Sequence, residues 1–289
     1  MVRHDLKVRR MDRNLKDTGF QRHVRACNNA ALPGTRLPFL VAGQAVGWLP
    51  PRIVAALAGG PEVVCAPGRV DMADPAALPG VAKLLSERGL YRWRGEAFDV
   101  RATPDGPALT RIDRGALPSF GIQATGVHVN GLVRRDDALH IWVARRAMDK
   151  QLDPGKLDHV VAGGVSAGYG LMDTLIKEAA EEAAIPPDLA VQAVHVGVIG
   201  YAMERPEGLR RDCLHCYDLA LPGDFTPTPS DGEVEAFELW PMRRVFETVR
   251  DTDDFKFNVN LVLIDLFIRQ GLIAGDEAES LRAGLKPPA

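Results

Sequence analysis

The chain has 289 residues, which at roughly 150 residues per domain corresponds to about two domains. Charged residues make up 25% and hydrophobic residues 46%, a composition that excludes disorder, collagen and coiled coil as descriptions of the whole chain. The net charge is −3, so no global basic field exists to bind a nucleic-acid backbone, and we expect no nucleic-acid partner. Four cysteines do not make a disulfide scaffold and fit a reducing compartment.

Targeting and membrane segments are not expected. The basic N-terminal stretch is interrupted by Asp5, Asp12 and Asp17 and is not followed by an apolar segment, so a secretory signal is not predicted. The longest apolar run, residues 261–268, is too short to span a bilayer and contains Asp265. We therefore predict a cytoplasmic protein without a membrane partner. The oligomeric state is left open, with a homodimer as one arrangement.

The first 122 residues are predicted to form a small α+β domain with a linker. Apolar periodicity, Pro and Gly predict its elements in this order: a helix over 12–31 with a solvated polar face that includes Arg22 and Arg25, a β segment over 38–51, a helix over 52–57, a strand over 62–70, a helix over 75–90 and a strand over 91–102. Residues 103–122 are rich in Pro and Gly and lack periodicity, which is typical of a linker or a long connecting loop.

Residues 123–289 are predicted to form a second, α/β domain. Two β-like runs flank Arg135-Asp136-Asp137 within 126–147, the pattern of a hairpin. The remaining patterns predict strands over 191–203, 214–222 and 233–240 and helices over 172–184 and 256–270.

The most informative segment is HVVAGGVSAGYGLMDTLIKEAAEEAAIPP, residues 159–187. It runs from an apolar strand into a loop that contains Gly163, Gly164, Gly168 and Gly170, residues that permit tight turns and close backbone approach to a ligand. A helix follows, which the prolines at 186 and 187 end.

Three glutamates lie on the polar side of this helix. Glu178, Glu181 and Glu182 are spaced i, i+3 and i+4, which places their carboxylates on one face within one turn. Like charges at this spacing repel, and a cation between them removes the penalty. Because hard divalent cations prefer oxygen ligands and bridge to phosphates, this face is a candidate site for Mg²⁺, with Mn²⁺ as an alternative. A solvated acidic face is the competing interpretation.

The loop and helix together resemble the Nudix box. That motif is a glycine, five residues, a glutamate, seven residues, then Arg-Glu-x-x-Glu-Glu-x-Gly and an aliphatic residue. Gly163, Glu178, Glu181, Glu182 and Ile185 match it. Three positions depart from it: Tyr169 stands where the first glutamate belongs, Lys177 replaces arginine and Ala184 replaces glycine. The resemblance implies a mixed sheet between helices and a metal held by Glu178, Glu181 and Glu182.

A wider resemblance covers roughly residues 15–285. The segments PFLVAGQAVGW, KEAAEEA, DLALPGDFTP, DGEVEAFELW and FKFNVNLVLIDLFIRQGLI resemble, in order, those of the Nudix domain fused to some fungal thiamine pyrophosphokinases and of plant chloroplast relatives. This resemblance implies a diphosphatase that converts oxidised or otherwise damaged thiamine diphosphate analogues to monophosphates. Its partner would be a small-molecule diphosphate.

Further residues are candidates for this chemistry. In Nudix enzymes a glutamate from a downstream turn often approaches the metal or the attacking water, and Glu233 and Glu235 both fit that position. A diphosphate also needs cationic donors, and Arg145, Arg146 and Lys156 precede the glycine loop. Gly163 and Gly164 are candidates for contact with the substrate.

The other notable residues favour structural roles. Cys213 and Cys216 flank His215 in a C-x2-C spacing, but no second ligand pair accompanies them and a strand points them to opposite faces. We expect Cys27 and Cys65 to be packing groups and His159 to be a structural histidine. Trp48 and Trp93 could line a substrate pocket, although core packing is the more common role.

Three alternative functions remain. The chain could hydrolyse another nucleoside-diphosphate-linked substrate, it could be similar to isopentenyl diphosphate isomerase, or it could be a Nudix-like binding module without catalysis. No cysteine occupies a convincing loop position for the isomerase. Retention of all three helix glutamates disfavours the binding module.

Overall fold

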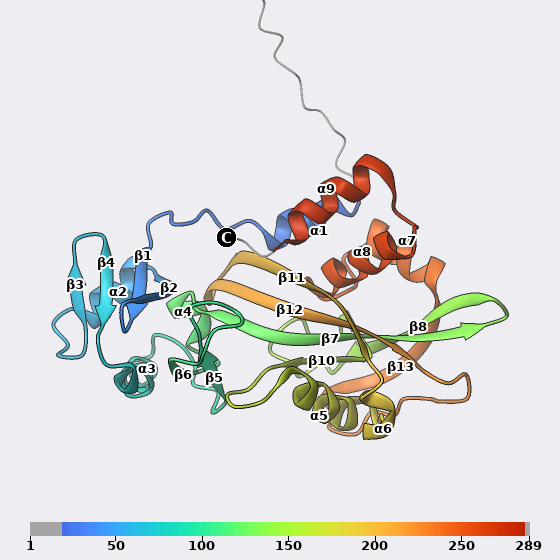
Figure 1. Cartoon of the computed structure of the whole chain (residues 1–289), viewed down its shortest axis with the longest axis horizontal. Helices are drawn as coiled ribbons and strands as arrows, with labels where there is room; N and C mark the ends of the chain where they lie inside the picture. The colour runs from blue at the N-terminus through green and yellow to red at the C-terminus, as the bar shows by residue number, and fades with distance from the viewer. Residues whose placement is uncertain (1–18, 287–289) are drawn as a thin grey trace, which may run out of the picture.

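The computed structural model describes residues 19–286 (Figure 1). Part of the predicted helix over 12–31 lies outside this range, and within it α1 spans Gln21–Cys27. No helix among the described residues is long and apolar enough to cross a membrane.

The N-terminal region contains a four-stranded sheet in the order β2-β1-β4-β3. Its strands are β1 (Leu37–Val41), β2 (Gln44–Leu49), β3 (Val64–Ala66) and β4 (Arg69–Met72). The predicted β segment over 38–51 is a hairpin that turns at Ala42 and Gly43, whose φ values are 48° and 76°. The single strand predicted over 62–70 is wrong, because Gly68 adopts a φ of 81° and folds the chain back into two antiparallel strands.

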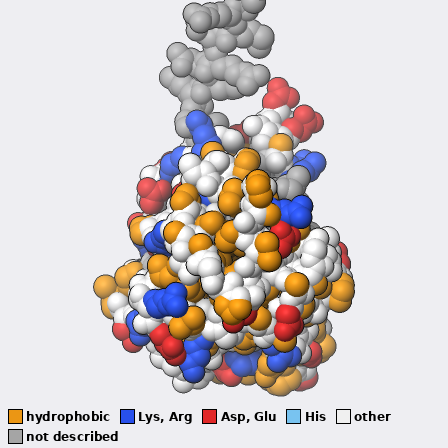
Figure 2. All heavy atoms as spheres, turned by 90° about the vertical axis from the view of Figure 1, so that its left-hand side faces the viewer, with side chains coloured by type: hydrophobic (Ala, Val, Ile, Leu, Met, Phe, Trp, Pro, Cys, Tyr) orange, Lys and Arg blue, Asp and Glu red, His pale blue; other side chains and the backbone are white. Residues whose placement is uncertain are grey.

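Helices α2 (Pro51–Leu57) and α3 (Leu78–Glu87) confirm the two helices predicted in this region. Their apolar sides, which include Ile53, Leu57 and Leu85, are buried in the N-terminal core. Lys, Arg, Asp and Glu side chains are interspersed on the face of this region that Figure 2 shows. That face therefore presents no broad patch of one charge.

Residues 103–122 are more structured than a linker. Strand β5 (Ala97–Val100) pairs with β6 (Thr110–Asp113), and α4 (Leu117–Phe120) follows. Ile112, Phe120 and Ile122 are buried in the N-terminal core. The Pro and Gly residues mark turns between short elements, whose burial has no regular period because each element is only four residues long.

The C-terminal region is built on a mixed seven-stranded sheet. Its main path runs β11-β12-β7-β8-β13, with β10 paired to β7 and β9 paired to β8. The strands are β7 (Gln123–Arg135), β8 (Ala138–Arg146), β9 (Leu157–Asp158), β10 (Val161–Gly164), β11 (Val194–Arg205), β12 (Gly208–Ala220) and β13 (Val234–Pro241). The predicted hairpin is confirmed: Asp136 and Asp137 both have positive φ, as a two-residue type I′ turn requires.

Helices cover both faces of this sheet (Figure 1). One face carries α1, α7 (Met242–Asp251), α8 (Val259–Arg269) and α9 (Gly275–Leu285), and the other carries α5 (Leu171–Ala183) and α6 (Pro187–Ala190). A separate apolar cluster lies beneath each layer. The architecture is the predicted α/β fold, a mixed sheet between helices preceded by a smaller α+β region.

Helix α1 packs with the C-terminal region. Phe20, Val24 and Cys27 belong to the same apolar cluster as α8 and α9. The expectation of a solvated Arg22 is wrong: its guanidinium donates to the carbonyl oxygen of Val249 at 3.1 Å, at the end of α7. Helices near both ends of the described range therefore pack in the same layer. The domain boundary predicted at residue 122 stays a prediction.

Candidate active site

The glycine segment places the acidic helix against the sheet. Strand β10 ends at Gly164, and α5 begins at Leu171, one residue before the predicted start. A Cβ atom at Gly163 would overlap the Cγ atom of Glu178. Gly163 is therefore needed for the Glu178 side chain to lie directly on the backbone of β10.

The three carboxylates of α5 differ in their surroundings. Glu182 is only 8% exposed, and its Oε2 accepts a hydrogen bond from the backbone N–H of Ala162 at 2.9 Å. Burial raises the pKa of Glu182 well above its ordinary value, and it also raises the pKa of Glu178. The side chain of Glu181 is half exposed, and its Oε2 accepts from Lys177 Nζ at 2.6 Å. Lys177 also donates to Glu178 at 3.2 Å.

The donor chemistry of this face fits a hard divalent cation. All three residues supply carboxylate oxygens, and burial disfavours the ionised form of two of them, a cost that a bound cation would offset. In the described structure these oxygens do not form a group within 4.8 Å of one another. Lys177 bonds both Glu178 and Glu181, so binding of one ion by all three carboxylates would require these side chains to rearrange.

His128, Asp158 and His159 form a buried cluster whose possible metal-ligand atoms all lie within 4.8 Å of one another. It is the one such group among the described residues. Asp158 is paired with Arg146 at 2.6 Å and with Lys256 at 3.4 Å, and the two histidine Nδ1 atoms are 3.0 Å apart. Two cations already neutralise the carboxylate, which opposes binding of a third. Burial lowers the pKa of both histidines, so each is a neutral, structural imidazole at neutral pH.

The two downstream glutamates occupy different positions. Glu233 pairs with Lys150, and its charge acts on both Glu178 and Glu182. Burial by itself raises the pKa of Glu233, but Lys150 outweighs it and holds the pKa below its ordinary value. Glu235 instead accepts from the backbone N–H of Met148 at 3.2 Å and is exposed. Of the two, Glu233 is the one in the electrostatic neighbourhood of the acidic helix.

The three cations proposed for the diphosphate have protein partners. Arg145 donates to the carbonyl oxygen of Gly155 at 3.2 Å, and Lys156 donates to that of Asp253. Arg146 is mostly buried in its ion pair with Asp158 and its bonds to loop carbonyls. Arg114, in the N-terminal region, was not anticipated, yet its charge also lowers the pKa of Glu233.

Two of the three departures from the motif, Lys177 and Ala184, have local explanations. Tyr169 is half exposed at the end of the glycine loop. Lys177 supplies a cation that bonds both Glu178 and Glu181. Ala184 ends α5 in the left-handed conformation, with φ 52° and ψ 31°, where a glycine fits without strain.

We expect Ala184→Gly to stabilise the protein. A left-handed alanine costs roughly 1–2 kcal/mol, part of which the extra chain entropy of an unfolded glycine offsets, so the net gain should be about 0.5–1 kcal/mol. Urea unfolding of the two proteins at pH 7 measures this gain. Ala180→Gly, in the middle of the same helix, is the control and should destabilise by a similar amount. A loss of stability in Ala184→Gly would contradict the inferred backbone strain at Ala184.

The cysteines have the expected positions with one exception. Cys27, Cys213 and Cys216 are buried, whereas Cys65 is exposed. Its expected role as a packing group is therefore wrong, because β3 is a short strand whose residues 64 and 65 both lie outside the N-terminal core.

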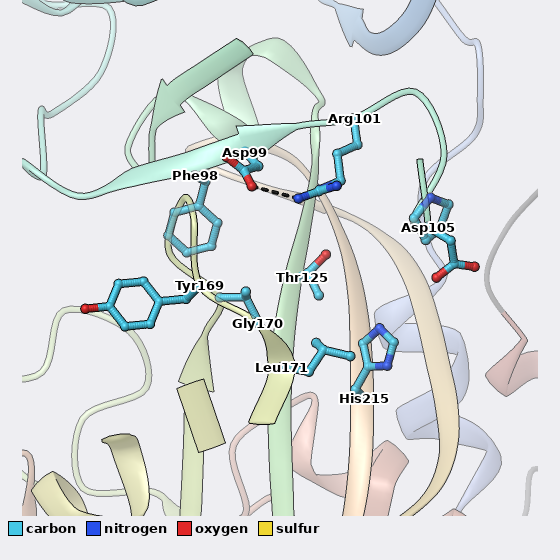
Figure 3. Close-up of a pocket in the computed structure, with 11 residues that line it drawn as sticks. Phe98, Asp99, Arg101, Asp105, Thr125, Tyr169, Gly170, Leu171 and His215 are labelled. Carbon is cyan, nitrogen blue, oxygen red and sulfur yellow. Dashed lines mark hydrogen bonds and ion pairs between the residues drawn. The ribbon is translucent and has the colours of Figure 1, made fainter. Parts of the chain in front are cut away.

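A cavity of about 200 Å³ lies between the N-terminal region and the start of α5 (Figure 3). Phe98 and Asp105 line it from the N-terminal region, His215 lines it from β12, and Tyr169 and Leu171 line it from the glycine loop and α5. These residues come from segments far apart in the sequence, so no local pattern indicated them. Trp48 and Trp93 are not among them.

Two family models and two relatives match this chain. A profile of the NUDIX domain matches residues 124–259, and a domain of unknown function, DUF4743, matches residues 19–124. Nudix hydrolase 24, chloroplastic, from Arabidopsis thaliana is 37% identical over 269 residues, which are 89% of this chain and 74% of that protein. Nudix hydrolase 20, chloroplastic, from the same plant is 35% identical over 93% of this chain and 77% of that protein.

Among solved structures, the chain is similar to the NUDIX domain of Shewanella oneidensis NrtR complexed with ADP ribose. It is 16% identical, with a TM-score of 0.42, over 54% of this chain and 92% of that chain. The matched domain and the two plant relatives show the class of protein: this chain belongs to the Nudix hydrolase family. It is a pyrophosphatase-type hydrolase with a DUF4743 domain before the Nudix domain.

Proposed function

We propose that this protein is a metal-dependent diphosphatase that converts oxidised or otherwise damaged thiamine diphosphate analogues to monophosphates. The observation that supports the hydrolytic chemistry is the acidic face of α5, with Glu178 lying on Gly163 and Glu182 buried beside β10. The choice of thiamine analogues rests on the resemblance of the whole chain to the thiamine-linked subfamily. We also propose a cytoplasmic location, which cell fractionation would test.

In this proposal Glu178, Glu181 and Glu182 hold the metal, Mg²⁺ or Mn²⁺. The ion would neutralise charge on the phosphoryl oxygens and make a water more nucleophilic. Glu233 is ionised at neutral pH, as an ordinary glutamate is, and it would accept the proton of the attacking water. Lys177 would compensate part of the carboxylate charge, and Arg114, which is paired with Glu96 at 2.7 Å, is a further candidate for the diphosphate.

Selectivity for damaged cofactor follows from charge. The thiazolium ring of thiamine is cationic, whereas oxidation to a thiazolone removes the charge. A cation loses more hydration free energy than a neutral ring when it enters a partly buried site. Oxythiamine retains the thiazolium and differs in its pyrimidine, so a preference for it would require a separate contact to that ring.

The test is release of monophosphate from a panel of diphosphates with and without Mg²⁺. In direct competition at equal concentration, we expect higher kcat/KM for the oxo- and oxy-thiamine diphosphates than for thiamine diphosphate. Faster hydrolysis of ADP-ribose or NADH than of every thiamine analogue would contradict the proposed substrate. It would not contradict the proposed diphosphatase activity. Isomerisation of isopentenyl diphosphate without hydrolysis, or binding without turnover, would overturn the diphosphatase as well.

A further inference from the structure

The N-terminal region holds the glycine loop of the Nudix domain in place. The backbone N–H of Ala167 donates to the carbonyl oxygen of Ala97 at 2.7 Å, and the Ser166 hydroxyl donates to Glu96 at 2.8 Å. A Cβ atom at Gly164 would overlap the Phe98 ring. Strand β5 is therefore docked on the loop that leads to the acidic helix α5.

The cavity beside this contact has an aromatic end and a polar end. In Figure 3, Phe98 and Tyr169 lie on one side, and Asp105 and His215 lie on the other, with Thr125 and Leu171 between them. Its volume of about 200 Å³ is below the roughly 300–1,000 Å³ of pockets that enclose a drug-sized ligand. It therefore suits one ring of a substrate whose remainder lies elsewhere.

The side chains of Asp105 and His215 line the polar end of the cavity. The Nδ1 atom of His215 is buried and has no hydrogen-bond partner in the described part of the chain. Asp105 forms no ion pair among residues 19–286 and is exposed, whereas Asp99, nearby, is paired with Arg101 at 2.8 Å. Burial and the neighbouring His195 lower the pKa of His215, so its imidazole is neutral. A carboxylate acceptor thus lies near a neutral imidazole that can donate or accept.

The cavity also lies at a suitable distance from the acidic face. It is lined by Leu171, the first residue of α5, and Glu178 follows seven residues later on the same helix. At 1.5 Å per residue, the separation along the helix axis is about 10 Å. A diphosphate at the carboxylates could therefore place an attached ring in the cavity.

We propose that this cavity binds the organic group of the diphosphate substrate, and that it selects a flat nitrogen heteroaromatic ring. The ring contacts Phe98 and Tyr169, and its edge, an N–H donor beside an acceptor, hydrogen-bonds to Asp105 and His215. The proposal rests on the proposed diphosphatase function and assigns the DUF4743 domain a direct part in substrate selection.

The test uses the full chain, Asp105→Asn, Phe98→Leu and the control Asp224→Asn. Asp224 is an exposed aspartate in the loop after β12, outside the cavity. Substrates are oxythiamine diphosphate, which carries rings, and isopentenyl diphosphate, which does not. Because Asp105→Asn weakens a hydrogen bond to a charged acceptor, we expect KM for oxythiamine diphosphate to rise about 10-fold with kcat nearly unchanged. The ring-free diphosphate and the control should be unaffected.

Binding of oxythiamine monophosphate, measured by calorimetry, separates this proposal from the hydrolytic one. Weaker binding to Asp105→Asn supports the cavity even if no diphosphate is hydrolysed. If Asp105→Asn hydrolyses oxythiamine diphosphate with an unchanged KM and binds the monophosphate as tightly as the native protein, the proposed role of the cavity is overturned. The proposed diphosphatase function then still stands. An equal loss of kcat/KM for oxythiamine diphosphate and isopentenyl diphosphate in Asp105→Asn also overturns the proposed role of the cavity. Phe98 is buried, so Phe98→Leu counts only if its thermal unfolding shows a folded protein; Asp105→Asn decides the question by itself.

Discussion

Glu182→Gln is expected to lower turnover by about 10²-fold or more, the scale of a lost electrostatic contact in the transition state. The substitution removes the charge and keeps the bulk, and the amide oxygen can still accept the hydrogen bond from Ala162. Steady-state hydrolysis under limiting Mg²⁺ measures the effect. Glu279→Gln, at an exposed position of α9, is the matched control and should retain full activity. Near-normal turnover in Glu182→Gln would remove Glu182 from the site.

The same substitution should not destabilise the fold in metal-free buffer. Folding raises the pKa of Glu182, so the folded state binds its proton more tightly than the unfolded state does. The cost of ionising this carboxyl therefore grows as pH rises from its ordinary pKa through the raised one. Because glutamine has no charge to bury, we expect Glu182→Gln to unfold at an equal or higher urea concentration than the native protein at pH 8. Lower stability there would indicate a packing role.

Asp158→Asn is expected to cost about 3–5 kcal/mol of folding free energy, because it leaves two buried cations without their counter-charge. Asp158 is paired with Arg146 at 2.6 Å and with Lys256 at 3.4 Å. Urea unfolding at pH 7 measures the loss. Asp224→Asn, at an exposed aspartate, should stay within about 0.5 kcal/mol of the native protein.

The pH dependence of this loss checks its cause. Burial alone would raise the pKa of Asp158, but Lys256 and Arg146 outweigh it and hold the pKa well below its ordinary value. A carboxyl whose pKa is lowered on folding stabilises the folded state at pH values above its ordinary pKa of about 3.9. This stabilisation is lost progressively as the pH falls below that value. The difference between native protein and Asp158→Asn should therefore shrink as pH falls below 3.9. A difference independent of pH would indicate altered packing instead.

Local patterns predicted the elements whose burial is regular. Helix α5 and the hairpin at Asp136 and Asp137 were predicted nearly to the residue, since apolar spacing and turn residues specify them without reference to the rest of the chain. Helices α7 and α9 were missed although their buried residues, such as Val245, Val249, Leu281 and Leu285, show helical spacing. The short strands β3, β4 and β6 lack enough residues to display a period.

The sequence by itself determined the acidic helix and the glycine loop, because each depends on residues that are neighbours along the chain, whereas the mixed sheet between helices was predicted from the resemblance to a known family. Tertiary structure decided the partners of each charge: Arg146 is paired with buried Asp158, and Glu233 rather than Glu235 lies in the field of the acidic helix. It also decided that β5 supports the glycine loop and that Phe98 and His215 line one cavity. Pairing and burial depend on distances between residues of different elements, which are 12 positions apart for Arg146 and Asp158 and 70 for Glu96 and Ser166, and local periodicity carries no information about those distances.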